Sequence, residues 1–164
     1  MTFKRRILAN LAGAVLSVLC ASIASADCRR DTVHLRGDWG QARFTVEVAD
    51  NAVSRSKGLM GRSHMPSSSG MLFVYHRTDD LAFWMKNTLI PLDIIFLDEM
   101  GVVVNIHHSA RPQDLTPLPS TAPSRYVLEI NGGLAKALGI EKGTQLKHPA
   151  VLQPNAAWAC REAG

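Results

Sequence analysis

The sequence predicts a single, mainly β domain, built as an antiparallel β barrel or sandwich with two short helices. Seven or eight short segments carry strand patterns and are separated by turn signals, and no internal repeat is present. Two short segments carry helix-start and helix-stop residues. Many short strands with few, small helices are typical of β barrels and sandwiches. An α+β arrangement is the alternative.

The predicted strands follow one another through the chain with turns between them. In the second, Phe44, Val46 and Val48 alternate with polar residues, which is the pattern of a strand with one buried face. Residues 99–101, Glu-Met-Gly, predict a hairpin turn. The segments expected to form strands are 32–35, 42–48, 71–75, 82–87, 92–97, 102–106, 126–130 and 144–147.

Two short helices are expected between these strands. Asp50 can cap a helix over residues 51–57, and Asn131 can cap a second helix over 134–138. A glycine follows each of these segments and is the residue that most often ends a helix.

The first 26 residues carry the features of a signal peptide. Lys4, Arg5 and Arg6 precede an apolar stretch over residues 7–24, and residues 24–26, Ala-Ser-Ala, offer small side chains to a signal peptidase. We expect cleavage before residue 27 and a periplasmic or secreted protein without a stable membrane anchor. A retained transmembrane segment is the alternative, but the stretch falls short of about 20 strongly apolar residues.

Removal of this segment changes the charge of the protein. The sequence has 18 basic and 14 acidic residues, and three of the basic residues precede residue 27, so 15 basic and 14 acidic residues remain. A net charge near +1 argues for neither nucleic acid nor an anionic membrane as a partner. Residues 27–164 suffice for a single domain with its own core.

Two cysteines, Cys28 and Cys160, lie near the two ends of the processed chain. Export favours oxidation, and domain termini often lie close together, so a disulfide between them is expected. Free thiols or an intermolecular bridge are the alternatives. The pair lacks the spacing of a redox-catalytic Cys-x-x-Cys motif.

Residues 111–124 hold four of the eight prolines in the sequence. A proline-rich stretch of this kind cannot pair in a sheet, so a long surface loop is predicted here. The loop is either a spacer across the end of the barrel or a lid over a site.

The most informative stretch of the chain runs from residue 58 to residue 98. It contains the phrases Gly-Leu-Met-x-Arg, Gly-Met-Leu-Phe, Phe-Trp-Met-Lys-Asn-Thr and Ile-Pro-Leu-Asp-Ile-Ile-Phe. With these phrases the chain resembles the family catalogued as domain of unknown function 192, over about residues 44–148. The resemblance also implies a mainly β fold, and it carries no known activity.

Asp93 lies within the apolar phrase of this stretch. Along a strand its carboxylate shares a face with Ile95 and Leu97, and burying it without a partner would cost several kcal/mol. Lys86, Arg62 and the backbone amides of residues 87–89 are the expected partners. Asp93 either pins this turn structurally, or contacts a ligand or handles a proton.

The neighbouring phrase predicts a recognition surface. If residues 82–88 are extended, Trp84, Lys86 and Thr88 share one face, while Phe83, Met85 and Asn87 share the other. An aromatic plate beside an ammonium and a hydroxyl group suits a carbohydrate or a small anion. Trp84 is alternatively part of the core. The candidate ligand-binding set is Arg62, Trp84, Lys86, Asn87, Thr88 and Asp93.

Sulfur side chains form a further cluster in the sequence. Four methionines and a histidine fall within 26 residues, and thioether ligands select Cu(I). Methionine is also a common filler of core gaps, so packing is the competing interpretation. The cluster consists of Met60, His64, Met65, Met71 and Met85.

Three functions remain open from the sequence. The preferred one is an exported, monomeric, non-enzymatic binding or accessory module for a small polar or carbohydrate-like ligand or another envelope component. The second is an envelope hydrolase that uses Asp93 as general base, with Lys86 or Arg62 stabilising negative charge. The third is Cu(I) binding. The sequence contains no Gly-x-Ser-x-Gly, His-Glu-x-x-His, phosphate-loop or dinucleotide motif, and no cofactor is expected.

Overall fold

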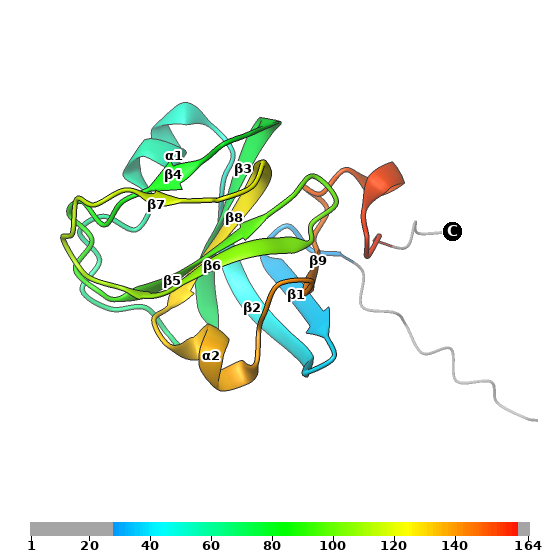
Figure 1. The fold of residues 1–164 in the computed structure, drawn as a ribbon, viewed down its shortest axis with the longest axis horizontal. Helices are drawn as coiled ribbons and strands as arrows, with labels where there is room; N and C mark the ends of the chain where they lie inside the picture. Colours follow the sequence, from blue (N-terminus) through cyan, green and yellow to red (C-terminus); the bar gives the residue numbers. More distant parts are fainter. Residues whose placement is uncertain (1–27, 161–164) are drawn as a thin grey trace, which may run out of the picture.

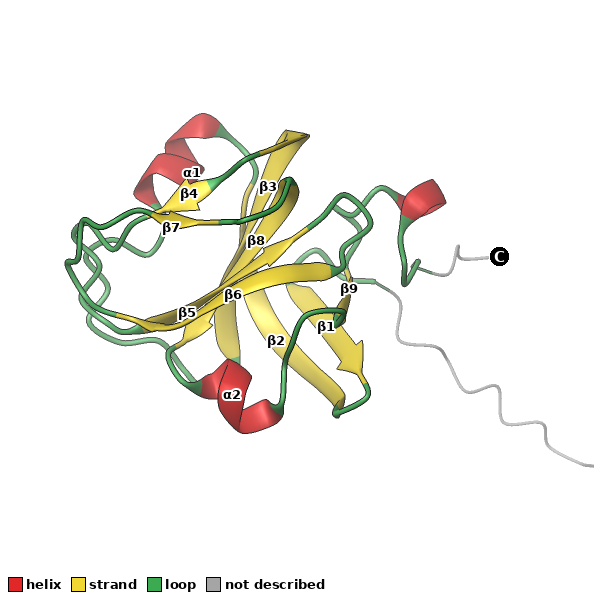
Figure 2. Ribbon diagram, viewed as in Figure 1, coloured by secondary structure: helices red, strands yellow, loops and turns green. Residues whose placement is uncertain are grey.

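The computed structural model describes residues 28–160 of the chain, so the predicted signal peptide lies outside the described residues. Seven strands form one curled sheet in the order β6-β5-β8-β3-β2-β1-β9 (Figures 1 and 2). The prediction of a mainly β fold with two short helices is confirmed. The strands are β1 (Thr32–Gly37), β2 (Gly40–Ala49), β3 (Ser69–Asp79), β5 (Leu92–Leu97), β6 (Val103–Ala110), β8 (Ser124–Asn131) and β9 (Gln145–Lys147).

All neighbouring strands of this sheet are antiparallel except β2 and β3, which pair in parallel. Parallel neighbours need a crossover connection, and the chain between these two strands supplies it with helix α1 (Ala52–Lys57). The sheet is therefore mainly antiparallel, as expected, with one parallel pair.

The two edges of the sheet meet near the start of β6. A bridge pairs Val102 with Gln145, and the amide of Val103 donates to the carbonyl of Thr144 at 2.8 Å. The amide of Leu146 donates to the carbonyl of Gly101 at the same distance. These bonds close the curled sheet over a short stretch, so the fold is a partly closed barrel.

Around β5 the sheet is buried on both faces, which explains the near-continuous apolar run in this strand. Ile95 and Leu97 pack in the interior core of the barrel, whereas Ile94 and Phe96 pack in a second core on the outer face. All six residues of β5 are buried. A strand covered on both sides cannot alternate apolar with polar residues.

A small second sheet covers part of this outer face (Figure 1). It pairs β4 (Ala82–Phe83) with β7 (Leu118–Pro119). The strand predicted over 82–87 is thus wrong beyond Phe83, because residues 84–85 belong to no strand and residues 86–87 form a turn.

The prediction that the proline-rich segment cannot pair is also wrong over two residues. Pro119 is tolerated because β7 is an edge strand, where a missing amide donor costs no ladder bond. Further backbone bonds fix the segment: Ser120 donates to Leu81 at 2.7 Å and Met85 donates to Asp114 at 2.8 Å. These bonds attach the proline-rich segment to residues 81–88, the stretch before β5 that contains the signature phrase Phe-Trp-Met-Lys-Asn-Thr (residues 83–88).

Both helices are found, but their caps differ from those expected. Asn51, and not Asp50, caps α1, because its side chain accepts from the amide of Ser54 in a reciprocal capping box. In helix α2 (Leu134–Leu138) the N-cap residue is Gly133, which has no side chain to cap the helix. The side-chain amide of Asn131 instead donates to the carbonyl of Met65 at 2.8 Å.

A disulfide joins Cys28 to Cys160, with the two Cα atoms 5.7 Å apart. This is the pairing expected from the sequence. The chain reaches Cys160 through a short 3-10 helix, η1 (Gln153–Asn155). Trp158 then lies beneath two cations, the guanidinium of Arg36 at 4.4 Å and the ammonium of Lys147 at 4.7 Å from its ring centroid.

Candidate functional site

A cavity of about 260 Å³ lies on the outer face of the main sheet, between helix α1, strands β3 and β8, and the signature phrase around β4. Seven of its thirteen described lining residues have aromatic or apolar side chains, and polar groups contribute the rest of the wall. Among its described lining residues, Glu129 is the one carboxylic acid. The lining residues are Arg55, Ser56, Lys57, Gly58, Leu59, Met60, Phe73, Tyr75, Ala82, Phe83, Trp84, Thr88 and Glu129.

Glu129 occupies a position that its strand would normally give to an apolar residue. It lies in β8 between Met71 of β3 and Ile94 of β5, on the face that Val127 also shares. The side chain is only 5% exposed, and in the described part of the chain its carboxyl group has no hydrogen-bond or ion-pair partner. Burial raises the pKa of Glu129 to about 8, so the group is a neutral acid at pH 7.

Arg55 reaches the same cavity from the last turn of α1. Its Nη1 donates to the carbonyl of Val74 at 2.9 Å, and its guanidinium carbon lies 5.0 Å from the ring centroid of Tyr75. Burial raises the pKa of Tyr75, the charge of Arg55 lowers it, and that of Glu129 raises it. Arg55 and Glu129 thus both influence the pKa of Tyr75, and no ion pair joins them in the described chain.

Trp84 forms the rim of this cavity and is 50% exposed. The ammonium nitrogen of Lys86 lies 5.1 Å from its ring centroid, so these two residues share an outward surface as the sequence analysis expects. Thr88 also lines the cavity but is buried, and its hydroxyl donates to the carbonyl of Lys86 at 3.3 Å. Asn87 adopts a left-handed conformation with φ of 54°, and its carbonyl accepts from the amide of Gly61.

Asp93 lies on the opposite face of the sheet from this cavity. It is fully buried and accepts three backbone hydrogen bonds, from Ser109 at 2.7 Å, Gly133 at 2.9 Å and Ala135 at 2.7 Å. The expectation that residues 87–89 supply these amides is wrong. The carboxylate instead holds the start of α2 against β6, which is a structural role.

Arg62 does not line the cavity, and it forms an ion pair with Glu47 instead. Both of its terminal nitrogens donate to the two carboxylate oxygens of Glu47 on β2. The pairing lowers the pKa of Glu47 and raises that of Arg62. The structure therefore brings Trp84 and Thr88 to one cavity, with Lys86 over Trp84, and leaves Arg62 and Asp93 elsewhere.

The methionine cluster divides between packing and surface positions. Met65, Met71 and Met85 are buried in the outer core, the cluster that also contains Phe73 and Phe96. Met60 lines the Glu129 cavity, and His64 is exposed. Within residues 28–160, no group of three His, Cys, Asp or Glu side chains is placed to hold a metal ion.

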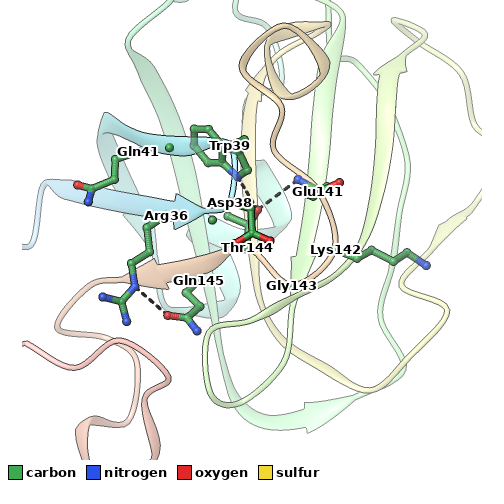
Figure 3. A pocket seen from close by; sticks show the side chains of 11 residues that line it. Arg36, Asp38, Trp39, Gln41, Glu141, Lys142, Gly143, Thr144 and Gln145 are labelled. Carbon is green, nitrogen blue, oxygen red and sulfur yellow. Dashed lines mark hydrogen bonds between the residues drawn. The ribbon is translucent and has the colours of Figure 1, made fainter.

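A larger cavity, of about 500 Å³, lies between the β1–β2 hairpin and residues 141–145 (Figure 3). Its polar groups bond to one another: Trp39 donates to Thr144 at 2.9 Å and Arg36 donates to Gln145 at 2.8 Å. Figure 3 shows Lys142 pointing away from these groups. Because Arg36, Trp39, Thr144 and Gln145 already bond to one another, this cavity is a weaker candidate than the one at Glu129.

Sequence reasoning missed Glu129, Arg55 and Tyr75. One signal was present, because Glu129 is the single charged residue within the strand segment Tyr-Val-Leu-Glu-Ile at 126–130. A lone acid in an apolar strand that is buried on both faces needs either a partner or a function.

Fold and site together define a partly closed β barrel with a small, aromatic-walled cavity outside the barrel. The sequence matches the family model DUF192, described as uncharacterized ACR, over residues 33–148. The chain belongs to this family, which confirms the resemblance noted in the sequence. The match begins before residue 44, so it includes β1.

The solved structures that are similar to this chain include the following two. A protein of unknown function from Novosphingobium aromaticivorans is 44% identical, with a TM-score of 0.69, over 70% of this chain and 82% of its own. A protein from Sinorhizobium meliloti, described as a putative transcription regulator, is 35% identical, with a TM-score of 0.71, over 77% of this chain and 98% of its own. No curated protein matches the sequence. Within residues 28–160, no helix is long and apolar enough to cross a membrane.

Proposed function

We propose that this protein is an exported, monomeric binding module that holds a small carbohydrate-like ligand of the cell envelope in the Glu129 cavity. The observation that carries the proposal is the buried acid of Glu129, which lines a cavity and has no partner in the described chain. A ligand in the cavity can bond to this carboxyl group and supply the partner that the described chain does not.

The chemistry of the cavity suits a sugar ring. A neutral carboxylic acid donates through its O–H and accepts through its carbonyl oxygen, and each sugar hydroxyl group can do the reverse. Trp84 and Tyr75 offer flat aromatic surfaces for the apolar face of a ring. A volume of about 260 Å³ falls just below the usual range of about 300–1,000 Å³ for drug-sized ligands, so one ring fits better than several.

Two features of the chain support action outside the cytoplasm. The N-terminal 26 residues read as a signal peptide, and the Cys28–Cys160 disulfide suits an oxidising compartment. The net charge near +1 after processing gives no electrostatic attraction to nucleic acid, and we propose no nucleic-acid partner. The hydrolase alternative loses its support, because Asp93 is committed to three backbone amides.

The proposal is tested by NMR titration of the folded protein, residues 27–164, with a panel of monosaccharides. We expect the backbone amides of Tyr75, Trp84 and Glu129 to shift at millimolar sugar. Glu129→Leu should abolish these shifts. The matched control, Glu141→Leu, removes a carboxylate at the larger cavity and should bind as the original protein does. A Glu129→Leu variant that is folded and binds normally would refute the proposal.

A further inference from the structure

The charged side chains that line the Glu129 cavity at neutral pH are mainly cationic. Two cationic residues at the end of α1, Arg55 and Lys57, contribute to its lining, and Glu129 is its single described carboxylic acid. Because burial raises the pKa of Glu129 to about 8, this acid carries little negative charge at neutral pH. The cavity therefore presents positive charge at one part of its wall and a neutral hydrogen-bonding group at another.

Two contacts hold Arg55 in place. One terminal nitrogen donates to the carbonyl of Val74, and the guanidinium carbon lies over the ring of Tyr75. In the described chain no carboxylate pairs with Arg55. A fixed guanidinium retains further N–H donors in a fork that matches the two oxygens of a carboxylate or a phosphate.

Two of the aromatic rings that line the cavity already have cations beside them. Arg55 lies near Tyr75, and the ammonium of Lys86 lies near Trp84. A cationic ligand would compete with these side chains for the rings and would be repelled by their charges. An anionic ligand meets attraction at Arg55 and no ionised acid at Glu129.

From this arrangement we infer that the ligand is an acidic sugar, whose anionic group pairs with Arg55 while its hydroxyl groups bond to Glu129. The inference rests on the proposed function and narrows its ligand class. The anionic group is a carboxylate or a phosphate, since the guanidinium fork accepts both.

The test measures the affinity of D-glucose, D-glucuronate and D-glucose 6-phosphate at pH 6.5 by NMR titration. A charged hydrogen bond to a fixed guanidinium predicts at least about tenfold tighter binding of one acidic sugar than of glucose. The two acidic probes distinguish carboxylate from phosphate. Arg55→Gln should remove this preference, and Arg55→Lys should keep part of it. Arg43→Gln, which neutralises an exposed arginine of β2 outside the cavity, should leave the preference unchanged.

The outcomes separate the two proposals. If glucose binds as tightly as both acidic sugars, or if Arg55→Gln keeps the full preference, the acidic-sugar inference is wrong while the binding module stands. If none of the three probes shifts the amides of Tyr75, Trp84 and Glu129 in the original protein, both proposals fail. Thermal unfolding of each variant shows whether its fold is intact.

Discussion

Arg55 and Glu129 line one cavity from two elements, α1 and β8, and no ion pair joins them in the described part of the chain. A cation and an acid that serve only stability would gain by pairing, since an unpaired buried acid is costly. Groups that are kept apart and poorly compensated are typical of sites retained for function. The unpaired acid of Glu129 thus lowers the stability of the fold while it serves the proposed ligand site, and the loss of stability can be measured.

The first prediction concerns the pH dependence of stability. The pKa of Glu129 rises from 4.5 in the unfolded chain to about 8 in the fold. A raised pKa means that its contribution to stability is fully present below pH 4.5 and is lost as the pH rises through 8. The loss amounts to about 1.4 kcal/mol per pH unit within that window. Urea unfolding at several pH values measures it.

Glu129→Gln removes the ionisable group while keeping its shape. The variant should be more stable than the original protein at pH 8 by a few kcal/mol, and the two should agree at pH 4. Equal stability of the two proteins at pH 8 would contradict the burial cost assigned to this acid.

The second prediction concerns Asp93. Asp93→Asn should destabilise the fold by about 2–4 kcal/mol, because an amide cannot accept all three backbone hydrogen bonds and turns a donor toward donors. Lys86→Met should have little effect, since Lys86 contacts Trp84 and not Asp93.

A double-mutant cycle of Asp93→Asn and Lys86→Met tests this assignment. We expect a coupling energy below about 0.5 kcal/mol, as for residues without shared partners. Strong coupling would mean that the two side chains form an ion pair, and it would overturn the structural role assigned to Asp93.

The third prediction concerns processing and oxidation. Intact-mass measurement of the exported protein should show loss of residues 1–26 and of two hydrogen atoms. The Cys28–Cys160 bridge closes a sequence separation of 132 residues, for which chain entropy gives about 5 kcal/mol as an upper value. Cys28→Ser with Cys160→Ser should therefore lower the unfolding temperature. Alkylation of both cysteines in the native exported protein would argue against the bridge.

The fourth prediction concerns the methionine cluster. Because Met65, Met71 and Met85 are packed in the outer core, Cu(I) should bind no better than it binds a variant with Met60 and His64 replaced. Titration against a competing Cu(I) chelator measures this. Stoichiometric binding that quenches tryptophan fluorescence would instead restore the copper interpretation.

Local patterns predicted most strands and both helices. The alternation of apolar with polar residues and the glycines that end helices can be recognised from neighbouring residues alone. The alternation around Asp93 also placed it correctly with Ile95 and Leu97 in the interior core. The partners of Asp93 were missed because Gly133 and Ala135 lie about 40 residues away, and only the fold brings their amides to it.

The candidate site was predicted only in part for a similar reason. Trp84 and Thr88 line the cavity and could be named from their phrase, whereas Arg55 and Glu129 come from other elements. Glu129 looks like an ordinary strand residue until its strand is known to be covered on both faces. The pairing of β4 with β7 was missed because proline normally argues against a strand.

The central claim is that Glu129 is a buried, unpaired acid that stays neutral at physiological pH. The direct test is a ¹³C NMR titration of its side-chain carboxyl carbon, assigned by comparison with Glu129→Gln. We expect the chemical shift of a neutral acid at pH 7 and a midpoint near 8. A midpoint near the ordinary value of 4.5 would contradict it.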